Sequence, residues 1–257
     1  MKDRDPAFKG LDAPSEVILV DPITRPIARG LARLKVHPLT LTFLAFLCRI
    51  TAGILFILGS LQWGAICSIA GFYLDGCDGK VARIRQIDEE LHGTTDFMLD
   101  HVAFAFMEIG AVIWAINNGH NLTVVLLVGW LALYMVFMSF TSTMFRILSQ
   151  RGIKYQEITY IGKEFVETSE NTNRKNPLVT FIRKPASIYF WAKEKSARFR
   201  MSPYLGAIES EISIFMLAPM FNFNNVLVAL SIVFLLPDTL FTTLLNMIKV
   251  LDARKKA

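Results

Sequence analysis

Residues 75–100 read DGCDGKVARIRQIDEELHGTTDFMLD, and this stretch decides how the rest of the chain is interpreted. It lies between two apolar segments, so its polar residues stand where two hydrophobic helices meet water. Asp75 and Asp78 are three residues apart, and Asp96 and Asp100 are four apart. Side chains at these spacings share one face of a helix. The pattern therefore predicts two pairs of carboxylates at one mouth of a helical bundle.

The chemistry expected of such a cluster is divalent-cation binding. Clustered carboxylates repel one another, and a hard cation with oxygen ligands relieves that repulsion. We therefore expect Mg²⁺ or Mn²⁺, and two such ions can clamp both reacting oxygens in a displacement at phosphorus. Arg83 is suited to contact phosphate, with Lys80 and Arg85 nearby. Small residues recur every third position and leave room for a ligand or a backbone: Gly76, Gly79 and Ala82.

The composition places this motif in a membrane protein. Hydrophobic residues make up 53% of the 257 residues and charged residues only 19%, below the roughly 25% of soluble domains. The net charge of +5 does not indicate nucleic acid, because cytosolic loops of membrane proteins are also basic. The three cysteines show no framework spacing, so no disulfide scaffold is expected. The polar N-terminus lacks the apolar run of a signal peptide.

The predicted fold is an all-α integral membrane bundle of six transmembrane helices, the second continuing through the aspartates to about Arg85. The approximate spans are Leu39–Gly59, Leu61–Leu74, Phe97–Ile116, Leu122–Leu148, Tyr204–Phe221 and Val226–Val250. Of 27 Lys and Arg residues, 26 lie in the N-terminal segment, in two of the connections with their helix ends, or at the C-terminal end. Cytosolic loops are enriched in these residues, so both termini and the aspartates are expected on the cytosolic side of the cell (inner) membrane.

Residues 1–38 are expected to form a cytosolic segment with an interfacial amphipathic helix. Asp21 is interpreted as its N-cap, with Pro22 in the first turn. Apolar residues recur on one face (Ile23, Ile27, Leu31 and Leu34) and basic residues on the others, as in helices that lie on anionic membranes. A helix packed on the protein is the alternative. Residues 39–250 form the six-helix domain with a long cytosolic loop at about 150–203, and residues 251–257 form a basic tail.

Charged residues also occur inside the predicted spans. Because a charge at that depth is rarely left unpaired, Arg49 is predicted to pair with Glu108 or Asp238. Glu209 and Glu211 are two residues apart near the start of the fifth span, so they are expected to point in different directions. Either one is a candidate to line a pocket, or to pack inside the bundle with a hydrogen-bond partner.

The motif resembles that of the CDP-alcohol phosphotransferase (CDP-alcohol phosphatidyltransferase) family, whose membrane enzymes make phospholipids from a cytidine-diphosphate donor and an alcohol. The family pattern is D-x2-D-G-x2-A-R-x8-G-x3-D-x3-D. It is matched at Asp75, Asp78, Gly79, Ala82, Arg83, Asp96 and Asp100. The pattern's second glycine falls on His92, with Gly93 one place later, so the chain departs from the family there.

This resemblance implies roles for the matched residues. Asp75, Asp78 and Asp96 would hold the metals, and Asp100 would join the metal site and act as general base. Gly79 and Ala82 would make room for the cytidine of the donor, and Arg83 would contact its phosphate. Relatives commonly form homodimers, and a homodimer is expected here.

The resemblance also implies the substrates. A phosphatidyl group would pass from CDP-diacylglycerol to an alcohol hydroxyl and release CMP; the alternative is a soluble CDP-alcohol donor with a lipid acceptor. Basic residues beside the long loop could hold a phosphorylated acceptor: Arg146, Arg151, Arg183 and Lys184. Two further alternatives are a divalent-cation transporter, since acidic clusters also mark ion paths, and an inactive membrane scaffold.

Overall fold

The computed structural model describes residues 12–87, 89–150, 191–192, 195–196, 199, 201–202 and 204–253, and the side chains of 89–94, 143–150 and 241–253 lie outside that description. The longer helices are α1 (Asp21–Arg33), α2 (Pro38–Ile57), α3 (Leu61–Arg85), α4 (Glu89–Asn117), α5 (Asn121–Gln150) and α10 (Asn225–Ala253). Short ones are α8 (Ala207–Glu211) and α9 (Ala218–Met220). Two π-helical turns, η1 (Glu16–Val20) and η4 (Ile212–Leu217), lead into α1 and α9.

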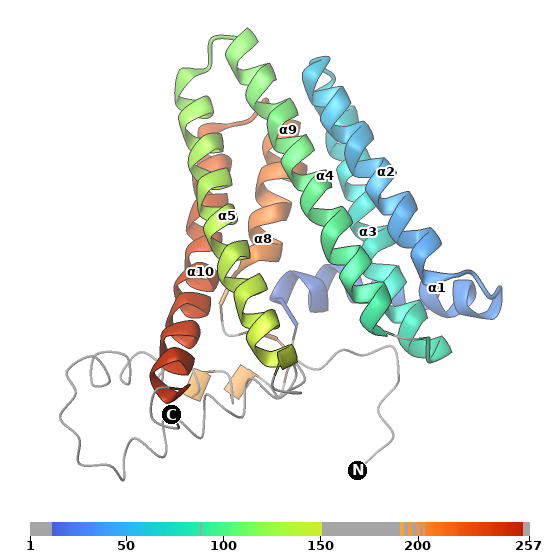
Figure 1. The fold of residues 1–257 in the computed structure, drawn as a ribbon. Helices are drawn as coiled ribbons and strands as arrows, with labels where there is room; N and C mark the ends of the chain where they lie inside the picture. The colour runs from blue at the N-terminus through green and yellow to red at the C-terminus, as the bar shows by residue number, and fades with distance from the viewer. Residues whose placement is uncertain are drawn as a thin grey trace.

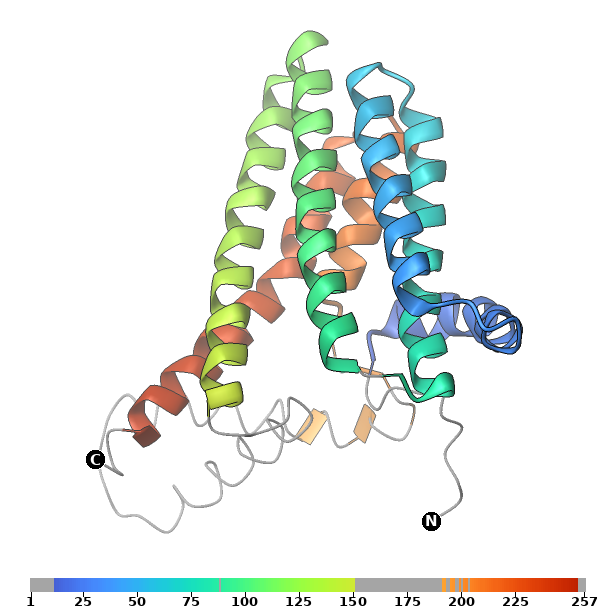
Figure 2. The same ribbon diagram turned by 45° about the vertical axis from the view of Figure 1, so that its right-hand side comes forward.

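The long helices stand side by side in a bundle, and α1 lies across its foot beside α3 (Figures 1 and 2). The α2–α3 and α4–α5 connections lie at the far end of the bundle. The α3–α4 connection therefore lies at the same end as α1, which we call the α1 end. The second half of α3 carries the DGCDG sequence in one unbroken helix to Arg85, as the sequence predicted.

Within the described residues, three helical segments are long and apolar enough to cross a membrane: Pro38–Ile57, Thr95–Asn117 and Asn121–Ser142. The Asn225–Leu240 part of α10 is apolar but shorter. The fifth predicted span is divided among α8, η4 and α9, and α3 carries charged residues through its second half. Helices thus occupy all six predicted positions, while the crossing of the membrane by all six stays a prediction.

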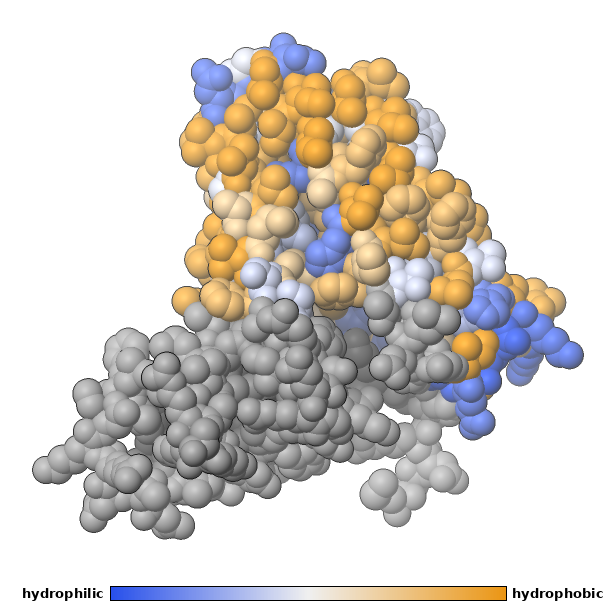
Figure 3. Space-filling model, viewed as in Figure 1, coloured by the Kyte–Doolittle hydropathy of each residue, from blue (hydrophilic) through white to orange (hydrophobic). Residues whose placement is uncertain are grey.

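The outer surface of the bundle is apolar. On the face seen in Figure 3, hydrophobic residues cover most of the described part, and hydrophilic residues gather on α1, at the opposite tip and in a small patch between them. Large apolar side chains such as Phe43, Trp63 and Val125 are exposed, the last two to 66%. Soluble monomers rarely expose apolar surface on this scale. The exposed belt fits a protein surrounded by lipid.

The interior is rich in aromatic residues, including Phe56, Trp130 and Phe215, which are almost fully buried. Close helix packing brings the backbones of α2 and α4 together at Gly53 and Gly110, where a Cβ on Gly110 would collide with the carbonyl oxygen of Gly53. Small residues of this kind allow membrane helices to approach closely. This crossing brings α4 against α2, the helix that carries Arg49.

The predicted amphipathic helix is present as α1, but its start was predicted wrongly. The chain already turns through η1 before Asp21, and no side chain caps α1. Asp21 is instead buried and forms ion pairs with Arg25 and Lys80. Ile23 and Ile27 are exposed, as expected for an apolar face turned toward a membrane. Contact of that face with a membrane stays a prediction.

Candidate active site

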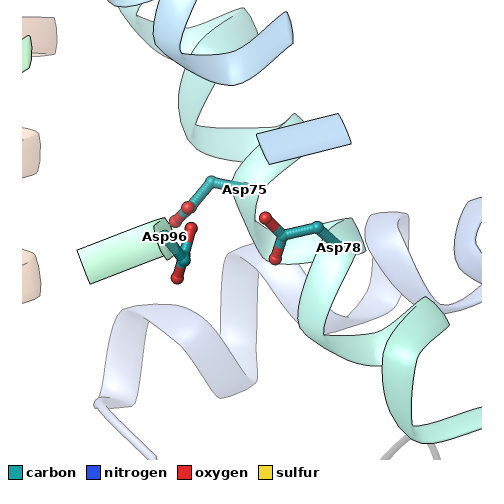
Figure 4. A group of neighbouring side chains, drawn as sticks. All are labelled: Asp75, Asp78 and Asp96. Atoms are coloured by element: carbon teal, nitrogen blue, oxygen red, sulfur yellow. The ribbon is translucent and has the colours of Figure 1, made fainter. Parts of the chain in front are cut away.

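Three of the four motif aspartates form a compact group near the α1 end of the bundle. Asp75 and Asp78 come from α3 and Asp96 comes from α4, and one carboxylate oxygen of each lies within 4.8 Å of the others. Figure 4 shows their carboxylates directed toward a common space between the two helices. The helical spacing in the sequence explains why Asp75 and Asp78 share one face of α3.

Two carboxylates of this group, those of Asp78 and Asp96, differ in their hydrogen bonding. Asp78 is buried, and its Oδ2 accepts a 2.5 Å hydrogen bond from Thr42 Oγ1 on α2. The other Asp78 oxygen accepts from the backbone N–H of Gly79. Asp96 Oδ1 is buried without a hydrogen-bond partner among the described residues. An orphaned buried carboxylate oxygen is costly unless a ligand or ion satisfies it.

These residues fit a hard divalent cation. The group offers oxygen ligands only, and Mg²⁺ and Mn²⁺ favour carboxylate oxygens with positions left for phosphate or water. The hydrogen bond from Thr42 is the kind of outer contact that orients a ligating carboxylate. The arrangement is therefore consistent with a metal site.

Asp100, the fourth aspartate of the motif, contacts a different partner from the three grouped aspartates. It accepts a close hydrogen bond from Nη1 of Arg49. Nη2 of the same guanidinium lies 3.4 Å from Asp75 and 3.4 Å from Glu211. Arg49 is 1% exposed, so a single buried cation contacts carboxylates from α3, α4 and α8.

The predicted partners of Arg49 were wrong. Asp238 instead accepts hydrogen bonds of 2.6 Å from the Tyr204 hydroxyl and 2.6 Å from the N–H of Ala207, at the start of α8. Glu108 is fully buried, and neither of its carboxylate oxygens has a partner among the described residues. The sequence predicted correctly that Arg49 is paired, but periodicity alone could not rank the available carboxylates.

The strip of small residues in α3 has two uses. A Cβ on Gly76 would come 3.0 Å from Val20, so Gly76 lets α1 and η1 pack closely on α3. A Cβ on Gly79 would come 3.3 Å from Nη1 of Arg83, so the absence of a side chain there leaves space beside that guanidinium. Ala82 is buried.

The other two basic residues of the motif serve the fold. Lys80 Nζ donates to Glu16 Oε1 at 2.9 Å and lies 3.2 Å from Asp21 Oδ1, so it points to the N-terminal helix. Arg85 donates to the carbonyl oxygens of Lys35 and Val36 at 3.0 and 2.6 Å. Both residues lie near Arg83 in sequence, but the structure gives both of them protein partners.

The carboxylates around Lys80 respond oppositely to their surroundings. Burial raises the pKa of Glu16, and the nearby Lys80 offsets this only in part. Burial would also raise the pKa of Asp21, but hydrogen bonds and charge from Arg25 and Lys80 outweigh it and lower that pKa. Glu209 on α8 also contacts this N-terminal region. Its Oε1 accepts hydrogen bonds from the N–H and hydroxyl of Ser15 at 3.0 and 2.7 Å.

A cavity of about 260 Å³ opens beside Asp96 and Asp100, between α4, α5 and the α8–η4 segment. Its polar wall includes Glu211, whereas Glu209 points to Ser15, so the two glutamates diverge as expected. Most of the remaining wall is aromatic. The lining residues are Asp96, Phe97, Asp100, His101, Phe104, Trp130, Tyr134, Phe137, Met138, Ala207, Ile208, Glu211 and Phe215.

Sequence reasoning missed Thr42 and the aromatic wall. Thr42 could have been found, because it lies seven residues before Arg49 and so on the same face of α2. Trp130 and Tyr134 look like ordinary core residues in a one-dimensional pattern. His92 and Gly93 lie in α4, but the side chains of His92 and Arg146 lie outside the description, as do Arg151, Arg183 and Lys184.

Fold and site together define the class of protein. It is a helical membrane bundle with a buried metal-binding centre, in which three clustered carboxylates suited to divalent cations lie beside a cavity. The sequence model of the CDP-alcohol phosphatidyltransferase family matches residues 35–249. The chain therefore belongs to this family and is a CDP-alcohol phosphotransferase. Comparison with curated proteins gives no match.

Proposed function

We propose that this protein transfers a phosphatidyl group from CDP-diacylglycerol to the hydroxyl of an alcohol, in a metal-dependent reaction that releases CMP. The observation that carries the proposal is the convergence of Asp75, Asp78 and Asp96 within 4.8 Å in a chain of this family. A group that gathers only carboxylates beside a cavity suits a substrate that brings phosphate oxygens and a cation together.

The three grouped aspartates are assigned to metal binding, and Asp100 completes the motif as general base. Two divalent cations bound there would neutralise the charge of the donor pyrophosphate and stabilise the charge that develops at phosphorus. Asp100 takes the proton of the acceptor hydroxyl while the hydroxyl oxygen forms its bond to phosphorus. The bond between that phosphorus and the CMP oxygen breaks, and CMP leaves with the electron pair.

The donor is assigned to the α3 side of the site. Gly79 leaves space beside the guanidinium of Arg83, which is suited to bidentate contact with a phosphate. Ala82 lies one turn further on, and its small side chain supports the assignment of this face to the cytidine moiety. Gly79, Ala82 and Arg83 all lie on α3, so the donor-binding residues of the family pattern come from one helix.

The cavity supports a substrate with both polar and apolar parts. Asp96, Asp100 and Glu211 lie on its wall together with aromatic side chains. The parts of α4 and α5 that line it are apolar enough to span a membrane. A lipid-linked donor would meet a polar alcohol at such a boundary. A soluble CDP-alcohol with a lipid acceptor would use the same boundary and is the alternative pairing of substrates.

We place the site on the cytosolic face of the cell membrane and expect a homodimer. The support for this orientation is the position of α1, whose basic residues lie at the same end of the bundle as the aspartates. Basic segments beside membrane helices favour the cytosolic side.

The test is CMP release by purified protein in detergent with Mg²⁺ or Mn²⁺, CDP-diacylglycerol or soluble CDP-alcohols, and a panel of alcohols, with product masses measured. We expect turnover that EDTA abolishes and that Asp78→Asn reduces by at least about 100-fold. Glu108→Gln is the matched control, because it changes a buried carboxyl of α4 that does not line the cavity. Wild-type protein that releases no CMP with any donor would refute the proposal, and Mn²⁺ flux into proteoliposomes under those conditions would favour a transporter.

A further inference from the structure

Arg49 holds an unusual position for a charged residue. It lies in α2, within a segment apolar enough to span a membrane, and it is 1% exposed. A buried cation is strongly destabilising unless opposite charges and hydrogen bonds compensate it. The compensation here comes from Asp75, Asp100 and Glu211, which belong to three different helices.

The contacts of Arg49 divide the four motif aspartates into unequal sets. Helical spacing places Asp96 and Asp100 on one face of α4, so both were expected to face Asp75 and Asp78. The compact group contains only Asp96 of this pair, whereas Asp100 contacts Nη1 of Arg49. Asp75 belongs to both sets, because one of its oxygens lies 3.4 Å from Nη2 of Arg49.

We propose that Arg49 is a positioning residue for catalysis, whose guanidinium holds the Asp100 carboxylate in the orientation needed to accept the proton of the acceptor alcohol. This inference rests on the proposed function, in which Asp100 is the base. One Asp100 oxygen accepts from Arg49, and Asp100 also lines the cavity, so its second oxygen is available to a hydroxyl there. The planar guanidinium fixes two nitrogens relative to each other, which the single ammonium of lysine does not do.

The second guanidinium nitrogen extends this arrangement to the cavity wall. Nη2 lies 3.4 Å from Glu211, at the end of α8, and Glu211 faces the same cavity as Asp100. The Phe104 ring lies 4.9 Å from the guanidinium carbon and covers it from α4. Arg49 therefore links the base to a second carboxylate of the cavity wall.

The main test is Arg49→Lys, which keeps the positive charge and removes the planar fork. We expect kcat to fall about 100-fold, because a small misplacement of a reacting group can cost that much in rate. The KM for the CDP donor and the Mn²⁺ concentration for half-maximal activity are expected to stay within about threefold, because lysine keeps the positive charge beside Asp75 and the three grouped aspartates are unchanged. Arg25→Lys is the matched control, since Arg25 pairs with Asp21 on α1 away from the cavity, and it is expected to leave kcat unchanged.

Two further measurements separate positioning from a purely structural role. Added guanidinium is expected to restore part of the activity of Arg49→Ala and none of that of Asp100→Asn. Glu211→Gln, which leaves Arg49 in place, is expected to lower kcat about tenfold without changing the Mn²⁺ requirement. This variant keeps the inference testable if neither Arg49 variant folds.

The outcomes are distinct from those that test the proposed function. Wild-type protein without CMP release contradicts the proposed function itself. Active wild-type protein with unchanged kcat in Arg49→Lys, or in Glu211→Gln where the Arg49 variants do not fold, overturns the positioning role of Arg49. Loss of Mn²⁺ activation in parallel with kcat in folded Arg49→Lys also overturns it, because Arg49 would then support the metal group rather than the base.

Discussion

Thr42 and Arg49 show how one face of α2 supports the site from a helix that carries no motif residue. Thr42 donates to Asp78, and seven residues later Arg49 contacts Asp75 and Asp100. The lone arginine inside a hydrophobic span signalled an internal pair, but it did not identify its partners. Those depend on how far α2, α3 and α4 slide along one another, which sequence periodicity does not specify.

Thr42→Val tests whether the outer contact of Asp78 tunes metal binding. The substitution keeps the side-chain shape and removes the 2.5 Å hydrogen bond to Asp78 Oδ2. Loss of such an outer contact typically costs 10–100-fold in metal affinity, so we expect the Mg²⁺ concentration for half-maximal activity to rise about tenfold or more. Activity measured across a Mg²⁺ titration checks this.

Thr51→Val is the matched control for that titration. Thr51 lies on the same helix, but its hydroxyl donates to Leu47 of its own helix at 2.8 Å, away from the aspartates. Equal Mg²⁺ requirements in Thr42→Val and Thr51→Val would contradict a role of Thr42 in holding Asp78.

Among the elements, α3 was the one most accurately predicted. Its start, its continuation through the aspartates and its end at Arg85 follow from an apolar run joined to a motif with helical spacing. The fifth predicted span was the least accurate, because a hydropathy pattern does not reveal that Glu209 and Asp238 bind the N–H groups of Gly206 and Ala207 and fix the start of α8. The Asp238 contact joins residues 31 positions apart in sequence, which local patterns do not connect.

The crossing of α2 and α4 provides a test at the scale of elements. Gly110→Ala would place a methyl group against the Gly53 carbonyl and push α2 from α4. Overpacking of this kind costs about 1–3 kcal/mol, so we expect a lower melting temperature and reduced activity. Gly129→Ala is the control, since the atom nearest its Cβ would be Ile232 Cδ1 at 3.9 Å. Equal melting temperatures in detergent would show that the two helices do not depend on this contact.

The junction between α1 and α3 predicts a pH-dependent stability. The pKa of Asp21 is lowered in the folded protein from its ordinary value of 3.8, so its ionised form favours the folded state. That contribution is fully present above the ordinary value and is lost as the pH falls through the lowered pKa. We expect Asp21→Asn to cost about 1.5–3 kcal/mol at pH 7, as for hydrogen bonds to charged groups, and less as the pH drops below 3.8.

Thermal melts of wild type and Asp21→Asn from about pH 2.5 to pH 7 would check this, because carboxylates titrate within that range. Glu16→Gln is the comparison, because the pKa of Glu16 is raised and its contribution is lost as the pH rises. Its effect at pH 7 is therefore expected to be smaller than that of Asp21→Asn. A difference between wild type and Asp21→Asn that does not vary with pH would exclude the charge of Asp21 as its source.

At the scale of the whole molecule, the sequence predicted the order of helices and the end of the bundle that carries the aspartates. Alternating apolar and basic segments determine both, since each reflects the environment of a whole segment. The cavity was beyond such reasoning. It arises where α4, α5 and α8 diverge, and its aromatic walls come from residues separated by more than a hundred positions. Local patterns carry no information on such a gap.

The number of membrane crossings and their direction form the last prediction. With six crossings, Gln86 and Ala257 lie in the cytosol, whereas Asn118 lies on the other side. The Asn117–Asn121 connection contains no Lys or Arg, in contrast with the basic end of α3, which is the asymmetry that directs insertion. Fusions ending at Gln86, Asn118 and Ala257 are expected to give cytosolic, external and cytosolic reporter signals. If only the three helices of sufficient length and hydropathy crossed, Ala257 would be external, so this fusion decides between three crossings and six.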